Sequence, residues 1–300
     1  MEFIDLVGNT PLLSLDRLAL IDGVKILAKA ELFNPSGSVK DRAARAMILD
    51  GLSQGALGPE KTIIDATSGN TGIAYAMLGA AFNRRVKLYL PANANIERKS
   101  LIRAYGAEIV ETDPLESSDG AFLTVKKAVA ENPDLYFFPD QYNNPANPNA
   151  HYEATAPEIW RQTDGQLTHF ICSLGTSGTF MGSAKRFKEY NSSIKTIIVQ
   201  PDSPFHGIEG TKHMNSTIRP GIYQESLVDG EIKVSTEQAY AMARRLARQA
   251  GILAGISSGA NVAAAFALGE KLPKGSVVVT ILADSGARYL SEHFWRDGHD

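Results

Sequence analysis

Short apolar runs alternate with amphipathic stretches along most of the chain. Runs such as 61–66, 86–90 and 276–282 have the length and the β-branched content of strands. Stretches such as 40–52 and 236–250 carry apolar residues at helical spacing. The other predicted strands are 24–30, 108–111, 136–138, 168–174 and 196–200, and the other predicted helices are 73–82, 97–105, 121–131, 180–190 and 260–268. Strands that alternate with helices predict an α/β fold of mostly parallel sheets flanked by helices.

The length of the chain predicts more than one lobe. Its 300 residues exceed the size at which a single core keeps growing, so we expect two lobes that can enclose a cleft. The segment 140–148 is rich in Asn and Pro, and we expect it to be irregular and to mark the domain crossover. We therefore expect domains at 1–145 and 146–300, with residues of about 12–34 joining the C-terminal sheet. The long loop 203–221 is expected to serve the substrate.

Composition argues against several classes of function. The 30 Lys and Arg residues nearly balance 33 Asp and Glu residues, which gives no electrostatic footprint for nucleic acid or for a membrane surface. Because no apolar run approaches the ~20 residues of a membrane span and the first residues lack a signal-peptide pattern, we expect a cytoplasmic protein. Cys172 is the single cysteine, and we expect it to be a small buried residue. No two histidines have the spacing of a helical zinc pair, so no metal site is predicted.

The stretch 34–42 (NPSGSVKDR) is the strongest candidate for chemistry. Ser38 is predicted to cap a helix, with Asp41 as its capping-box partner, which places Lys40 in the first helical turn. The positive end of the helix dipole and the nearby Arg42 should lower the pKa of Lys40 and favour a nucleophilic amine. The alternative interpretation is an ordinary exposed lysine.

Three glycine loops accompany this lysine. The loop 175–179 (GTSGT) lies between a predicted strand and helix, so its N–H groups and hydroxyls can hold a phosphate; it lacks the ATP-binding and dinucleotide spacings. The loop 67–72 (TSGNTG) offers donors for a carboxylate. Taken alone, each of these two loops is equally consistent with a plain turn or a capped helix start. The third loop is 257–259 (SSG), and its residues Ser257 and Ser258 are equally consistent with helix N-caps. A lysine, a phosphate cradle, a carboxylate cradle and a buried hydroxyl together suggest pyridoxal phosphate.

Five motifs, in this order and at this spacing, resemble those of one enzyme family. NPSGSVKDR, TSGNTG, GTSGT, GISSGA and DSGARYLS closely resemble motifs of the O-acetylserine sulfhydrylases, or cysteine synthases. These are fold-type II pyridoxal phosphate enzymes, with the two-domain fold of the tryptophan synthase β subunit. The resemblance runs from Gly8 to about Phe294, and the run 151–170 is similar to the B-type enzymes in particular.

The resemblance implies roles for individual residues. Lys40 would form the Schiff base with the cofactor and move the Cα proton, Asn70 would bind the cofactor's 3′ oxygen, and Ser257 would face its pyridine nitrogen. The phosphate would be held by Gly175, Thr176, Ser177, Gly178 and Thr179. The substrate carboxylate would be held by Thr67, Ser68, Gly69, Thr71 and Gln141. A neutral serine cannot keep the ring nitrogen protonated, which weakens the electron sink and favours expulsion of a β leaving group.

The resemblance also implies an activity. The protein would be a homodimer that eliminates acetate from O-acetyl-L-serine and adds a sulfur nucleophile to an aminoacrylate to give L-cysteine. A partner protein of sulfur assimilation is implied as a further option. Ser177 departs from the usual Gly or Thr but keeps a hydroxyl, so the expected phosphate site is little affected. The loop 203–221 lacks the paired arginines and tryptophan of some B-type enzymes, so the sulfur donor stays open among sulfide, thiosulfate and a carrier thiocarboxylate.

Rival functions use the same residues differently. O-phosphoserine could replace acetylserine, with Lys212 or Arg219 as the extra cation, or homocysteine could serve as the nucleophile to give cystathionine. A catalytically silent scaffold protein would retain the fold without turnover. A nucleotide-binding oxidoreductase is disfavoured by the glycine spacing.

Overall fold

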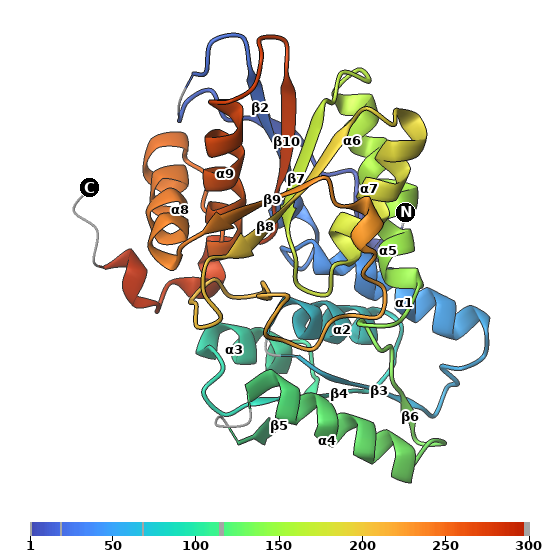
Figure 1. The fold of residues 1–300 in the computed structure, drawn as a ribbon. Coiled ribbons are helices and arrows are strands. Elements are labelled where there is room, and N and C mark those ends of the chain that lie inside the picture. Colours follow the sequence, from blue (N-terminus) through green and yellow to red (C-terminus); the bar gives the residue numbers. More distant parts are fainter. Residues whose placement is uncertain (1, 19, 68, 114–116, 297–300) are drawn as a thin grey trace.

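The computed structural model describes residues 2–18, 20–67, 69–113 and 117–296, and their strands form two sheets in two lobes (Figure 1). The larger sheet has the order β1-β2-β10-β7-β8-β9, in which all neighbours are parallel except β1 and β2. Its strands are β1 (Leu12–Ser14), β2 (Lys25–Ala30), β7 (His169–Ser173), β8 (Lys195–Pro201), β9 (Gly230–Val234) and β10 (Val277–Leu282).

Helices cover both faces of the larger sheet. The helices α8 (Thr236–Ala250) and α9 (Ile256–Gly269) lie on one face, and α6 (Ala156–Gln162) and α7 (Gly178–Tyr190) lie on the other (Figure 1). The central strand β10 is buried along its whole length. Val278 faces the core beneath α8 and α9, whereas Val279 faces Phe170 and Phe180 in the core beneath α6 and α7. This alternation is why an uninterrupted apolar run forms a strand here.

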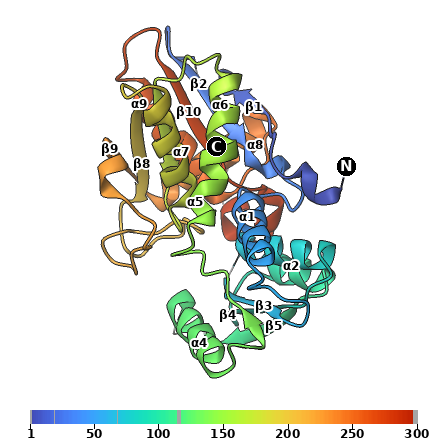
Figure 2. The same cartoon turned by 90° about the vertical axis from the view of Figure 1, so that its right-hand side faces the viewer.

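The smaller sheet has the order β5-β4-β3-β6 and is parallel throughout. Its strands are β3 (Thr62–Ala66), β4 (Val86–Pro91), β5 (Glu108–Thr112) and β6 (Tyr136–Phe137), and its helices are α2 (Asn70–Ala81), α3 (Ile96–Ala104) and α4 (Ser117–Glu131). The helices α2 and α4 lie on opposite sides of the sheet (Figure 2). Ile63 packs in the core shared with α2, and its neighbour Ile64 packs against Phe122 and Val125 of α4.

One helix joins the two lobes. The helix α1 (Lys40–Ser53) packs against α2 of the smaller lobe and against α5 (Ala146–Ala150), which leads through a π-helical turn at His151–Thr155 into α6 of the larger lobe. The helix α1 therefore lies where the two lobes meet (Figure 2).

All the strands and helices predicted above are present, with shifted ends. The helices α2 and α9 begin several residues earlier than predicted, and the short elements β1, β9, α5 and α6 were not predicted. The expectation that all of 140–148 is irregular is wrong, because α5 begins at Ala146. Pro145 at its N-cap and Pro148 in its first turn need no intrahelical N–H bond. Residues 12–14 and 25–30 do pair in the larger sheet, while the domain boundary itself stays a prediction.

No helix in the described ranges combines the length and the apolar character that crossing a membrane requires.

Candidate active site

The loop before α1 is fixed against the end of β10. The Val39 N–H donates to the Ala283 carbonyl at 2.8 Å, and the Ser285 N–H donates to the Gly37 carbonyl at 3.2 Å. These bonds hold Lys40 at the carboxyl ends of parallel strands, the edge at which α/β proteins bind ligands.

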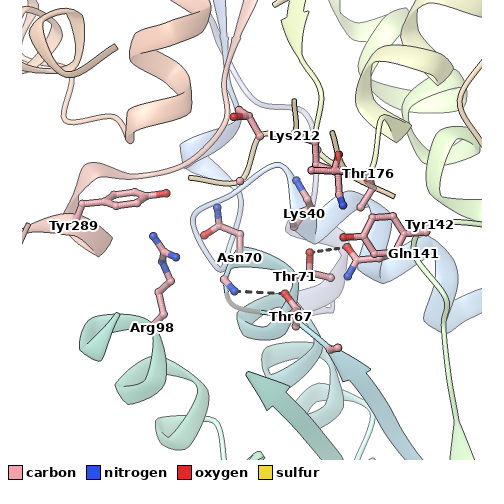
Figure 3. Close-up of a pocket in the computed structure, with 16 residues that line it drawn as sticks. Lys40, Thr67, Asn70, Thr71, Arg98, Gln141, Tyr142, Thr176, Lys212 and Tyr289 are labelled. Atoms are coloured by element: carbon pink, nitrogen blue, oxygen red, sulfur yellow. Dashed lines mark hydrogen bonds between the residues drawn. The ribbon is translucent and has the colours of Figure 1, made fainter. Parts of the chain in front are cut away.

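Two connected cavities meet at Lys40. The wider has a volume of about 280 Å³ and opens between the lobes (Figure 3), and the deeper has a volume of about 40 Å³. Both are lined by Lys40, Asn70, Gly175, Thr176 and Gly210. The wider cavity adds Thr67, Gly69, Thr71 and Gln141, and the deeper one adds Ser177, Thr179 and Ser257. Three segments that are far apart in sequence, namely the lysine loop, the loop after β3 and the loop after β7, thus converge on one cleft.

Lys40 is the first residue of α1, as predicted, but the predicted cap is wrong. Val39 occupies the N-cap position, and neither Ser38 nor Asp41 makes the capping-box bonds. The Asp41 carboxylate instead accepts the Ser36 N–H at 2.6 Å and the Ser36 hydroxyl. The Asp41 carboxylate therefore stabilises the loop that precedes α1 and does not cap the helix.

The pKa of Lys40 is lowered, in the predicted direction but for another reason. Burial of the amine in the cleft is the main cause, and the nearby Asp284 carboxylate acts in the opposite direction. Arg42 does not supply the expected repulsion, because its guanidinium is bound to Glu31 and Glu158 on the other side of the helix. The neutral amine that a nucleophile requires is therefore favoured by desolvation.

The loop 175–179 forms a cradle at the N-terminus of α7. Ser177 has left-handed backbone angles, with φ of 71°, and its buried Oγ has no hydrogen-bond partner in the described structure. A Cβ at Gly178 would lie 2.0 Å from Asn147 Oδ1, and a Cβ at Gly175 would lie 2.5 Å from the Gly210 carbonyl. Glycine is required at both positions, and the turn presents N–H groups and hydroxyls to the deeper cavity, as an anion site does.

The loop after β3 lies across the cleft from this cradle. The Thr71 hydroxyl donates to Gln141 Oε1 at 3.0 Å, and the Gly69 N–H donates to Thr67 Oγ1 at 3.4 Å (Figure 3). These four residues line the wider cavity together, and their role in holding a carboxylate stays a prediction. Ser68, the fifth predicted member, lies outside the described residues.

Asn70 and Ser257 border the deeper cavity. Asn70 Nδ2 donates to Asp284 Oδ2 at 2.7 Å, and Arg288 donates to Asn70 Oδ1, so the amide orientation is fixed from both ends. Ser257 lies in the first turn of α9, whose N-cap is Gly255, which makes the N-cap interpretation of the two serines wrong. Ser258 accepts the Ala283 N–H at 2.9 Å instead.

Three lining residues, Arg98, Tyr142 and Tyr289, were not predicted from sequence. Arg98 lies 4.7 Å from the ring centre of Tyr289 and pairs with Glu209, and Tyr142 lies with its ring centre 4.8 Å from Nζ of Lys212. Tyr142 adjoins Gln141 and Tyr289 belongs to the DSGARYLS motif, so both had a sequence signal. Arg98 had none, because an arginine in an amphipathic helix is usually a surface residue.

Cys172, Arg219 and Lys212 lie in or near the cleft. Cys172 is buried, as predicted, and burial raises the pKa of its thiol to about 12, which leaves it unreactive. It also lines the deeper cavity. Arg219 does not line either cavity and bonds to Glu225 at 3.0 Å, whereas Lys212 does line the wider one.

Comparison with known proteins places this cleft in a family. The family model described as "Pyridoxal-phosphate dependent enzyme" matches residues 4–284. The chain belongs to this family. It is 50% identical to a cysteine synthase of Aquifex aeolicus over 298 residues, which covers 97% of this chain and 91% of that protein. It is 41% identical to cysteine synthase B of Salmonella typhimurium, covering 98% and 95% of the two chains.

Solved structures agree on the fold of this pyridoxal phosphate enzyme. The crystal structure of the cysteine synthase of Entamoeba histolytica superposes with a TM-score of 0.94 at 36% identity, covering 100% of this chain and 91% of that one. The resemblance inferred from the five motifs and the predicted α/β fold of type II are confirmed.

The cleft suits the cofactor of the family. A phosphate would meet the unpartnered Ser177 hydroxyl and the N-terminus of α7, and an aldehyde would meet the Lys40 amine in the adjoining space. Asn70 and Ser257 offer one amide and one hydroxyl along the same cavity. The donor set matches a phosphorylated pyridine with a phenolic oxygen.

Proposed function

We infer that this enzyme makes L-cysteine from O-acetyl-L-serine and a sulfur donor, with pyridoxal phosphate as cofactor. The observation that supports this inference is the position of Lys40, which lines both the cavity bordered by Thr67, Thr71 and Gln141 and the cavity bordered by the 175–179 turn. The likeness to cysteine synthases over nearly the whole chain supports the substrate and the reaction.

Each residue of the cleft is proposed to have a distinct task. Thr67, Ser68, Gly69, Thr71 and Gln141 would bind and orient the substrate carboxylate, and residues 175–179 would hold the cofactor phosphate. When bound, the cofactor supplies an aldehyde for the lysine and a ring that withdraws electrons from the reacting carbon. Lys40, uncharged because it is buried, would take the proton from Cα of the substrate. Ser257 would offer the ring nitrogen a neutral hydroxyl.

The substitution Lys40→Ala tests this assignment. We expect the purified variant to lose the visible absorption of the lysine-bound cofactor and its turnover, because both depend on the same amine. The exposed Lys271→Ala serves as the matched control and should keep both. A Lys40→Ala protein that still turned over acetylserine, or a wild-type protein without turnover, would contradict the proposal and favour the silent scaffold.

The substrate pair is tested by parallel assays. Acetylserine with sulfide, phosphoserine with sulfide, and serine with homocysteine are compared, and we expect acetylserine with sulfide to give the highest kcat/KM. Of the two cations predicted to meet a phosphate, Lys212 lines the wider cavity, whereas Arg219 bonds to Glu225. Thiosulfate and a carrier thiocarboxylate are then compared with sulfide as donors.

We further propose a cytoplasmic homodimer that has a partner in sulfur assimilation. Phe3 and Leu6 of the N-terminal turn are both about half exposed, at 50%, and a second subunit would cover them. The buried, unpaired Cys172 suits a reducing compartment. Light scattering on the purified protein measures the mass directly, and a monomeric mass would contradict the dimer.

A further inference from the structure

Asp65 is a buried carboxyl directly behind the proposed carboxylate site. It lies near the end of β3 with 1% of its surface exposed. Its Oδ1 accepts the Ala66 N–H at 2.7 Å, and its Oδ2 accepts Gln141 Nε2 at 3.3 Å. The Tyr75 hydroxyl of α2 is a further partner, and Asp140, in the segment after β6, is the charged group that faces it. The reaction described above gives Asp65 no role.

The hydrogen bonds around Gln141 have a fixed direction while Asp65 is ionised. An ionised carboxylate accepts but does not donate, so it holds the Gln141 amide with Nε2 towards Asp65 and Oε1 towards Thr71. The Thr71 hydroxyl has one proton, and that proton is donated to Gln141 Oε1. Only the oxygen lone pairs of Thr71 then remain for the cavity, and these repel a carboxylate.

A proton on Asp65 reverses this direction. Protonated Asp65 can donate to Gln141 Oε1 once the amide has turned over, which brings Nε2 towards Thr71. Thr71 then accepts from Gln141, and its own proton is released to point into the cavity. Protonation also removes the negative charge of Asp65 from behind the site.

We propose that Asp65 is a positioning residue that sets the hydrogen-bond direction of Gln141 and Thr71, so that binding of the substrate carboxylate is coupled to proton uptake by Asp65. This inference rests on the proposed function, because it takes the carboxylate of an amino acid as the ligand of Thr71 and Gln141.

The environment of Asp65 makes such coupling available near neutral pH. Burial raises its pKa to about 7, and the charge of Asp140 acts in the same direction. The protonated form binds better, so affinity is highest below this pKa and falls as pH rises through it. The fall amounts to about tenfold per pH unit until the pKa of the complex is reached.

The experiment uses the cofactor-loaded enzyme and L-serine as the probe. The dissociation constant of L-serine is measured from the visible spectrum across neutral pH, together with KM for acetylserine. In Asp65→Asn the side-chain amide can donate to Gln141 Oε1 at every pH, so the ratio of wild-type to variant dissociation constants should be flat below neutrality and rise above it. This ratio cancels the titration of the amino group of the probe.

Asp140→Asn is the matched variant. It removes the charge that adds to the effect of burial on the pKa of Asp65 and leaves the Gln141 bond in place, so the midpoint of the ratio should move to lower pH. In infrared difference spectra, addition of L-serine to the wild type should produce the carbonyl band of a protonated carboxyl, and Asp65→Asn should lack it.

The outcomes distinguish a failure of the proposed coupling from a failure of the proposed function. An Asp65→Asn enzyme with the pH dependence of the wild type, an unmoved midpoint in Asp140→Asn, or a wild-type infrared spectrum without the band would each overturn the coupling. If Asp65→Asn does not fold, the dissociation constants of L-serine for the wild type and Asp140→Asn are compared directly at each pH, which also cancels the titration of the probe, and the wild-type infrared spectrum is the second measurement. A wild type that binds L-serine with the expected pH dependence but makes no cysteine would instead overturn the proposed function.

Discussion

Two groups of buried polar side chains lie on opposite sides of α1, and they are built differently. The charge cluster consists of Lys29, Glu31, Arg42 and Glu158, two cations and two anions. Arg42 bonds to both oxygens of Glu31 and both oxygens of Glu158 at 2.6–2.8 Å, and Lys29 pairs with Glu158 at 2.7 Å. Every charge of this cluster has an opposite charge beside it.

The polar groups of the cleft are less completely matched. Ser177 Oγ and Asp284 Oδ1 are buried without a hydrogen-bond partner in the described structure, and the charged neighbour of Asp65 is another acid. Unmatched polar groups lower stability unless a ligand completes them. The charge cluster therefore holds α1 in place, whereas the cleft contains polar atoms that a ligand could still bind.

The largest expected effect comes from removing the centre of the charge cluster. Arg42→Met leaves two buried carboxylates without their shared cation, and we expect a loss of about 3–5 kcal/mol in the free energy of unfolding. Urea denaturation of the cofactor-free protein measures it. The control is Lys274→Met, which breaks an ion pair with Asp22 whose side chains are 74% and 84% exposed, and should cost at most about 1 kcal/mol. Equal losses in the two variants would show that the charge cluster stabilises the protein no more than an exposed ion pair does.

Acid should weaken the same cluster. The cations beside Glu158 lower its pKa from 4.5 to about 2, and the pKa of Glu31 is lowered as well. The stabilisation is therefore complete above about pH 4.5 and is lost as pH falls towards about 2. Glu158→Gln should flatten the pH dependence of the unfolding free energy in this window. Glu153→Gln, an exposed neighbour in the preceding turn, should leave the window unchanged.

Filling the anion cradle should harm binding rather than folding. In Gly178→Ala the new methyl group would meet Asn147 Oδ1, which displaces the turn, and we expect the affinity for pyridoxal phosphate to fall at least about tenfold. Gly58→Ala adds a methyl group where no atom lies within 4 Å and should bind the cofactor normally. Spectroscopic titration of the cofactor-free proteins with pyridoxal phosphate compares the two. A tight-binding Gly178→Ala protein would show that the cradle is not the phosphate site.

The smallest expected effect is that of Ser177→Gly, which should raise the stability of the cofactor-free protein and lower its affinity for the cofactor. Ser177→Gly relieves a left-handed backbone at a non-glycine residue, so the cofactor-free protein should gain about 1 kcal/mol. The variant also loses the unpartnered hydroxyl, so its affinity for the cofactor should fall. Ser177→Ala, which loses the hydroxyl but keeps the strained backbone, should lose affinity without the gain. Thermal unfolding with and without cofactor separates the two contributions.

The same contrast explains how far the sequence could be interpreted. Elements with strong apolar patterns, such as the helical periodicity of α8 and the uninterrupted apolar run of β10, were predicted because their apolar positions face a core directly. Four of the predicted site residues line one cavity, namely Lys40, Asn70, Thr176 and Gln141. Their assigned roles stay predictions.

What was missed depends on contacts between distant segments. Asp41 bonds to Ser36 rather than capping α1, and Arg42 is drawn away from Lys40 by Glu158, which lies 116 residues along the chain. Local spacing contains no information about such partners. The edge strand β9 was missed although its residues alternate between exposed and more buried positions, because five residues give a weak pattern.

The larger sheet sets an order for synthesis of the chain. Strand β2 leaves the ribosome long before β10, with which it pairs in parallel, and the loop that orients Lys40 bonds to Ala283 just beyond β10. Until β10 has been made, β2 keeps one edge open to unwanted partners, and the Lys40 amine has no fixed position. A nascent chain released early would therefore be both prone to aggregate and unable to capture its cofactor.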